Sequence, residues 1–123
     1  MAAMSKDSNI IQDKSFDFAV RVVKLYRHLT ENKKEYVLSK QFLRSGTSIG
    51  ANVEEAIGGQ TRKDFGTKIN LAYKEARETR YWLKLMKATD YLNESEADSM
   101  LKDCDENLRI LAAITKTIYT QKD

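Results

Sequence analysis

The chain has 123 residues, enough for one domain with a core of its own. It has no proline and only five glycines, which favours long helices, and its 32% of charged and 9% of aromatic residues exclude a disordered chain. The net charge of +3 permits binding to nucleic acid without requiring it.

Two further features indicate where the protein acts. No segment approaches the roughly 18 consecutive apolar residues of a membrane helix, so we expect no membrane association. The single cysteine, Cys104, cannot form an intrachain disulfide, which fits a reducing compartment. We therefore expect a cytoplasmic bacterial protein.

The first predicted helix begins near Asp13 to Ser15 and ends at about Thr30. Its apolar residues recur at steps of three and four, which is the pattern of a helix that packs against a core. They are Phe18, Val22, Leu25 and Leu29. We expect residues 1–12 to be frayed and residues 31–35 to form a polar connecting loop.

The second predicted helix runs from about Val37 or Ser39 to Ile57. Its middle is rich in small residues that form helices poorly, so tertiary packing must hold it together. These residues are Ser45, Gly46, Gly50 and Ala51. Because glycine lets two backbones approach closely, we expect tight packing here, in an antiparallel contact with the helix that follows.

The third predicted helix follows the Gly58-Gly59 turn, begins with a Thr61 cap and ends at about Thr89. One seam repeats at steps of four and three, as in a coiled coil. It contains Phe65, Ile69, Ala72, Ala76, Thr79, Leu83 and Met86. A second stripe is rotated by about 100° from that seam. It contains Leu71, Glu75, Glu78, Trp82 and Leu85.

The fourth predicted helix follows a cap formed by Asn93 and Glu96. Its expected seam contains Ala97, Leu101, Cys104, Leu108, Leu111, Thr115 and Ile118. Four helices with short connections predict an all-α fold, an antiparallel up-down-up-down four-helix bundle that spans residues 1–123 as one domain.

Two segments resemble a known family: LRSGTSIGANVEEA and KDFGTKINLAYKEARETRYWLKLM. The family is that of small bacterial four-helix bundle proteins encoded in intervening sequences of large-subunit ribosomal RNA genes. The resemblance implies an antiparallel bundle that assembles into a ring-like homopentamer. More remotely, the chain is similar to the accessory proteins of diversity-generating retroelements, basic pentamers that bind a reverse transcriptase and nucleic acid.

The second stripe of the third helix has two interpretations. Leu71, Trp82 and Leu85 could cover the edge of the monomer core, or they could form a subunit interface, where tryptophan is a common anchor. The pattern alone does not separate these alternatives, and the family resemblance favours the interface.

Glu75 and Glu78 lie between the apolar residues of this stripe, and a partly desolvated carboxylate needs a partner. We expect Arg44 of the second helix to supply it. A metal site is the alternative, but helical carboxylate sites use Glu-x-x-His pairs, and the only histidine, His28, belongs to the first helix. We therefore expect a structural ion pair, and neither a metal nor a cofactor.

Cations lie on the side of the third helix roughly opposite its core seam, with Tyr81 among them. The set is Lys63, Lys74, Arg77 and Lys84, with Arg80 and Lys87 nearby. These residues could simply form a solvated face. Repeated around a homo-oligomer, they would form a basic surface that binds RNA or other nucleic acid.

Arg21 and His28 offer an enzymatic alternative. Their spacing resembles the Arg-x(4–6)-His motif of helical-bundle nucleases of the higher-eukaryote and prokaryote nucleotide-binding superfamily, although Val22 replaces the usual polar residue. The favoured function is a non-enzymatic homo-oligomeric scaffold that binds RNA or a protein partner through its basic surface. The two alternatives are this ribonuclease and an adaptor that binds only a protein partner.

Overall fold

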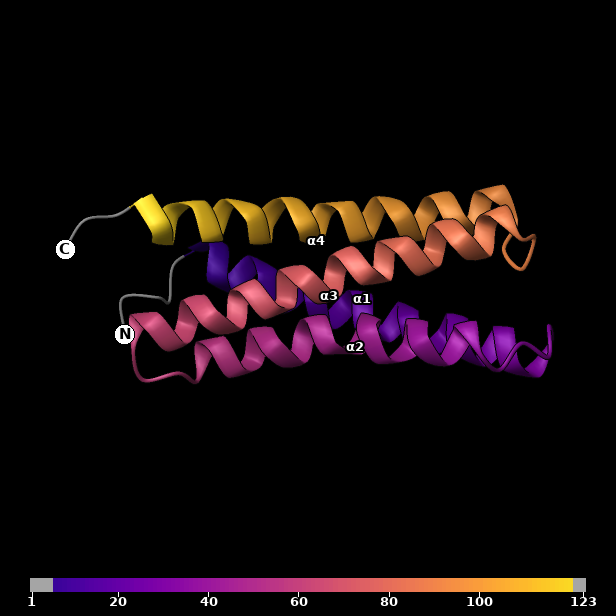
Figure 1. The fold of residues 1–123 in the computed structure, drawn as a ribbon, viewed down its shortest axis with the longest axis horizontal. Helices are drawn as coiled ribbons and strands as arrows, with labels where there is room; N and C mark the ends of the chain where they lie inside the picture. The colour runs from indigo at the N-terminus through magenta and orange to yellow at the C-terminus, as the bar shows by residue number, and fades with distance from the viewer. Residues whose placement is uncertain (1–5, 121–123) are drawn as a thin grey trace.

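The computed structural model describes residues 6–120, and these form four antiparallel helices (Figure 1). They are α1 (Lys6–Glu31), α2 (Leu38–Ile57), α3 (Arg62–Ala88) and α4 (Glu94–Thr120). Each helix packs against the next, and α4 also contacts α1. The predicted all-α, up-down-up-down four-helix bundle is confirmed. Within residues 6–120, no helix has the length and apolar character needed to cross a membrane.

The start of α1 differs from the prediction. The helix begins at Lys6, so the expectation that residues up to 12 are frayed is wrong for 6–12, while residues 1–5 lie outside the described part. Ile11 is fully buried and continues the core stripe one heptad before Phe18. The polar Ser15, which is also buried, interrupts the apolar pattern between them and conceals its continuity.

Side-chain caps fix the starts of α3 and α4 as predicted. The Thr61 hydroxyl accepts a hydrogen bond from the Asp64 backbone N–H at 3.0 Å. At α4, the Asn93 side chain accepts from the Glu96 N–H at 2.8 Å, and the Glu96 carboxylate accepts from the Asn93 N–H at 3.1 Å. Each cap satisfies N–H groups that have no partner within the helix.

The start of α2 has a cap that the sequence pattern did not reveal. The buried Glu35 carboxylate accepts hydrogen bonds from the backbone N–H groups of Val37, Leu38 and Ser39. Burial disfavours the charged form of Glu35, but these donors and the Ser39 hydroxyl outweigh it, so the pKa of the carboxyl is lowered. Glu35 therefore belongs to the α2 terminus rather than to a solvated loop.

The predicted core seam of α3 is buried along its whole length. The seam of α4 is correct only in part, because three of its seven predicted residues, Ala97, Cys104 and Leu111, are buried and the other four are not. Leu101, Leu108, Thr115 and Ile118 are half-buried at the edge, and Met100, Asn107 and Ile114 are buried instead. The pattern failed because Asn107 is polar. Its side chain is nevertheless buried, and its amide N–H donates to the Asp103 backbone carbonyl at 3.0 Å.

The small residues of α2 give close packing, but mainly against α1 rather than α3. A Cβ added at Gly46 would lie 2.7 Å from a methyl group of Val22, and one at Gly50 would lie 3.3 Å from the Ser15 carbonyl oxygen. Ser45 is the member that faces α3, where its Oγ accepts a hydrogen bond from the Thr79 hydroxyl at 2.9 Å. Ala51 is exposed, so its assignment to tight helix packing is wrong.

Candidate nucleic-acid interface

Four of the six predicted cations stand on the outer side of α3. Lys63, Lys74, Arg77 and Lys84 are exposed, and within residues 6–120 none of them has an ion-pair partner. At 100° per residue they fall within an arc of about 80°, and at 1.5 Å per residue they extend over about 30 Å. We call these four residues and Tyr81 the basic ridge.

The other two predicted cations are turned toward α4 and are already paired. Arg80 Nε donates to an Asp105 carboxylate oxygen at 2.7 Å, and Lys87 Nζ donates to Asp98 at 2.8 Å. The hydrogen bond to Asp98 raises the pKa of Lys87. The six residues therefore do not form one surface: four project outward, and two link α3 to α4.

Tyr81 lies within the ridge, between Arg77 one turn before it and Lys84 one turn after it. Its side chain is 58% exposed. Its ring contacts the Trp82 ring with a centroid distance of 5.1 Å and an interplanar angle of 72°. This edge-type contact orients the tyrosine ring without stacking another ring on it.

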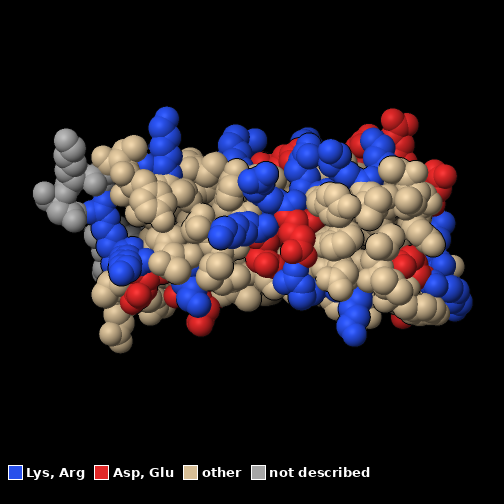
Figure 2. All heavy atoms as spheres, viewed as in Figure 1, with Lys and Arg blue, Asp and Glu red and all other residues tan. Residues whose placement is uncertain are grey.

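The side of α3 that faces α2 holds the predicted ion pair. The Arg44 guanidinium donates to Glu75 at 2.9 Å and also contacts Glu78. Glu78 accepts a further hydrogen bond from Trp82 Nε1 at 3.1 Å. Partial desolvation opposes the charge on Arg44, but the two carboxylates outweigh it and raise the pKa of Arg44. Figure 2, which has the same view as Figure 1, shows a group of acidic side chains near the middle of the face over α2 and α3, with basic side chains around it.

Apolar side chains border this ion pair. Leu71 is 38% exposed, and Trp82 and Leu85 are half-buried. Trp82 packs against the core cluster, yet part of it reaches the surface. This arrangement is compatible with both interpretations of the stripe, since Trp82 covers the edge of the core and is also partly exposed.

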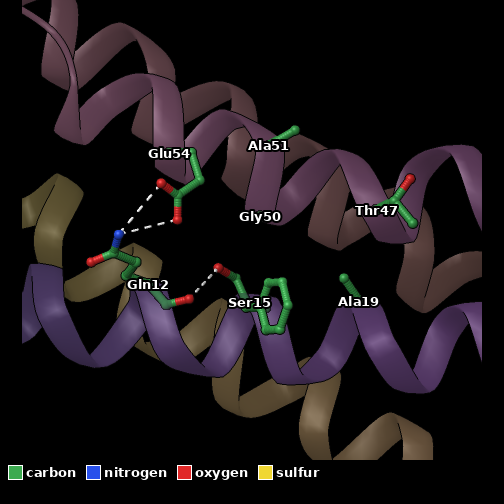
Figure 3. Close-up of a pocket in the computed structure, with 8 residues that line it drawn as sticks. Gln12, Ser15, Ala19, Thr47, Gly50, Ala51 and Glu54 are labelled. Carbon is green, nitrogen blue, oxygen red and sulfur yellow. Dashed lines mark hydrogen bonds between the residues drawn. The ribbon is translucent and has the colours of Figure 1, made fainter.

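A shallow hollow of about 160 Å³ lies between α1 and α2 (Figure 3). Small side chains form much of its lining, and the exposed Phe16 stands beside it. The Gln12 amide donates to the Glu54 carboxylate at 3.1 Å, so these two polar groups bind each other. The lining residues are Gln12, Ser15, Phe16, Ala19, Thr47, Gly50, Ala51 and Glu54. The sequence stripes did not predict this hollow, because Phe16 lies off the core face of α1.

A family model described as 23S rRNA-intervening sequence protein matches residues 7–113. The chain belongs to this family. It is also similar to a solved structure from Bacteroides thetaiotaomicron, described as a protein with unknown function from the S23 ribosomal protein family. The two are 49% identical, the match covers 89% of this chain and 98% of that one, and the TM-score is 0.88. No curated protein matches significantly. The resemblance to the family encoded in rRNA intervening sequences is confirmed.

The two residues of the nuclease alternative lie on the seam between α1 and α4. Arg21 donates to Asp103 and Ser99, and the His28 ring lies 2.8 Å from the Asn32 amide and 3.9 Å from the Glu96 carboxylate. A phosphate placed between Arg21 and His28 would therefore approach Asp103 and Glu96, which are repulsive neighbours.

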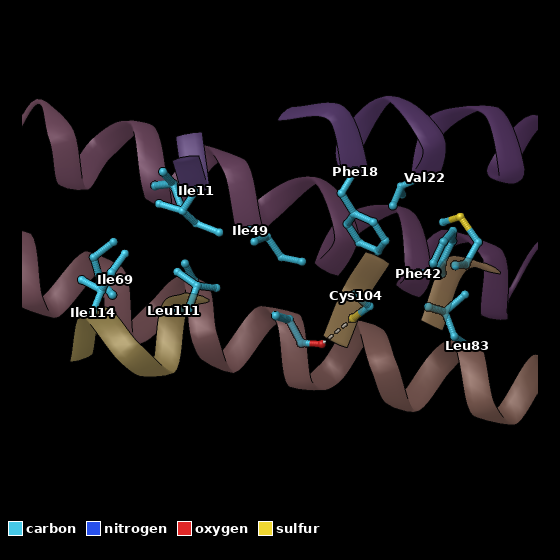
Figure 4. Close-up of a cluster of buried hydrophobic side chains, with 14 of the residues drawn as sticks. Ile11, Phe18, Val22, Phe42, Ile49, Ile69, Leu83, Cys104, Leu111 and Ile114 are labelled. Carbon is cyan, nitrogen blue, oxygen red and sulfur yellow. Dashed lines mark hydrogen bonds between the residues drawn. The ribbon is translucent and has the colours of Figure 1, made fainter. Parts of the chain in front are cut away.

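The cysteine of this family member belongs to its core (Figure 4). Cys104 Sγ donates to the Ala76 carbonyl at 3.4 Å, and burial raises the pKa of the thiol to about 12. Since the thiolate is the nucleophile, Cys104 has no reactive form near neutral pH. Among residues 6–120, no three His, Cys, Asp or Glu side chains come together as a metal site would need.

Proposed function

We propose that the protein is a non-enzymatic, homo-oligomeric scaffold of the bacterial cytoplasm that binds RNA through the basic ridge. The observation that carries this proposal is that, within residues 6–120, Lys63, Lys74, Arg77 and Lys84 have no ion-pair partner, while Arg80 and Lys87 of the same helix bind carboxylates. Unpaired cations along one helix match the regular negative charge of a nucleic-acid backbone.

Self-association would use the neighbouring side of α3. Leu71, Trp82 and Leu85 offer apolar surface there, and Arg44 partly neutralises the two carboxylates that lie among them. The subunit number of five is the one that the family resemblance implies. A ring of five chains would repeat the basic ridge five times, so that weak contacts combine into tight binding.

Retention of a structured RNA on the immobilised protein, measured against salt concentration, tests the binding. We expect retention at low salt that falls as salt rises, and a loss of retention when Lys74, Arg77 and Lys84 are changed to alanine. Retention that is insensitive to salt and to these changes would contradict the proposal. RNA that is shortened by the wild type but not by His28→Ala would contradict the non-enzymatic part.

Light scattering tests the assembly. The wild type should have a mass of about 70 kDa, which is five copies of the 14.1 kDa chain. Leu71→Lys places a charge on the proposed interface without opening the core, and it should lower the mass while circular dichroism stays unchanged. Tyr81→Ala is the matched control, because it removes exposed apolar surface on the ridge instead. A wild-type mass of one chain would contradict assembly.

A further inference from the structure

We infer that the basic ridge recognises unpaired nucleotides, with a base stacked on Tyr81 while Arg77 and Lys84 contact the adjoining phosphates. This inference rests on the proposed RNA binding and specifies the class of RNA. It depends on the juxtaposition of an exposed aromatic ring with two cations that have no ion-pair partner in the described part of the chain, all on one side of α3.

The ring is placed for stacking. Tyr81 is more than half exposed, although an aromatic ring on a helix gains little from facing water. Trp82 meets it at 72° rather than in parallel, so the contact holds the ring in position without a second ring stacked on it. An exposed tyrosine ring is a sequence-tolerant platform for a base.

The cations are placed for the phosphates on both sides of that base. Arg77 and Lys84 precede and follow Tyr81 by one turn each, so their Cα atoms are about 10 Å apart along the helix. Lys74 continues the ridge beyond Arg77. Glu78, three residues before Tyr81, contacts the Arg44 guanidinium and Trp82 Nε1, so its carboxylate is engaged on the side that faces α2.

Double-stranded RNA fits this ridge less well. Its bases are stacked on one another, and its major groove is too deep and narrow for side chains to read. A duplex could contact the cations through its phosphates, but it offers no base to Tyr81. The structure therefore predicts a preference for single strands that depends on the tyrosine ring.

Fluorescence anisotropy with a labelled 12-nucleotide uridine RNA, alone and paired with its adenosine complement, tests the inference. We expect wild type to prefer the single strand, Tyr81→Ala to weaken single-strand binding by about five- to a hundredfold, and duplex binding to stay unchanged. Tyr81→Phe, which keeps the ring, should bind like wild type. Because Trp82 is the only tryptophan, its emission should change when the single strand binds to wild type.

The outcomes separate this inference from the proposed function. Alanine at Lys74, Arg77 and Lys84 could weaken the binding of both RNAs while Tyr81→Ala changes the binding of neither. In that case the ridge contacts only phosphates, and the inferred base contact is wrong. Equal weakening of both RNAs by Tyr81→Ala would also overturn it. If neither RNA binds wild type, the proposed function itself fails. Circular dichroism and melting of each variant exclude a loss of fold, which an exposed position should tolerate.

Discussion

Helix α3 carries two sets of cations that differ in what they contact. Arg80 and Lys87 face α4 and bind Asp105 and Asp98, whereas the cations of the basic ridge face outward and have no carboxylate partner among the described residues. The rotation between Arg80 and the ridge residue Arg77 is about 60°, yet it decides whether a cation links two helices or is free for a ligand. Availability, and not the number of cations, marks a candidate phosphate-binding surface.

The largest effect is expected from removing cations of the basic ridge. With Lys74, Arg77 and Lys84 changed to alanine, binding to single-stranded RNA should weaken by about a hundredfold at 0.1 M salt, because each phosphate contact contributes about fivefold. Anisotropy titrations measure this effect. A change below about fivefold, with the fold intact, would show that the ridge is only a solvated face.

The two paired cations, Arg80 and Lys87, can be freed by removing their carboxylate partners. Asp98→Asn and Asp105→Asn remove the carboxylates that hold Lys87 and Arg80. Binding should then tighten by up to about fivefold for each released cation. The same titrations measure the gain. Asp64→Asn, which removes an acid at the start of α3 that holds neither cation, is the matched control, and an equal gain there would point to net charge alone.

A smaller effect is expected from deleting the paired cations. Arg80→Ala and Lys87→Ala together should weaken RNA binding by less than about fivefold, the contribution of a single phosphate contact. Their main result should be a slightly lower melting temperature, since two exposed links between α3 and α4 are lost. A loss of binding as large as that of the ridge variant would erase the distinction between the two sets.

Low pH should reduce the stability of the fold through Glu35, the carboxylate that caps α2. The folded-state pKa of Glu35 lies below its unfolded value, so its stabilisation is present above the unfolded pKa and is lost as pH falls through the folded pKa. Glu35→Gln should cost about 1 kcal/mol near neutral pH and reduce the loss of stability on acidification, as measured by urea unfolding. Identical acid profiles for the two proteins would contradict the capping role.

Much of the fold follows from local patterns, and the departures have particular causes. The seam of α3 and the caps at Thr61 and Asn93 depend on residues close in sequence, which the pattern contains. Asn107 and Ser15 were missed because a periodicity of apolar residues does not identify buried polar ones, whose side chains here donate to backbone carbonyls of their own helices.

The candidate site was predicted only in part for a similar reason. The helical spacing separates Lys74 and Lys84 from the core, but the pairing of Arg80 and Lys87 depends on where α4 places Asp105 and Asp98. That placement is a property of the tertiary structure. The ion pair of Arg44 could be predicted because two acids on an otherwise apolar stripe require a cation from the adjacent helix.

The salt dependence of binding tests the central claim most directly, since it counts the phosphate contacts made by the outward cations. The logarithm of the affinity for the single-stranded RNA should fall linearly with the logarithm of the salt concentration. The variant with alanine at Lys74, Arg77 and Lys84 should have a slope shallower by about 2, at roughly 0.7 per contact, while the Arg80→Ala, Lys87→Ala protein keeps nearly the wild-type slope. Equal slopes for the wild type and both variants would contradict the binding of phosphates by the basic ridge.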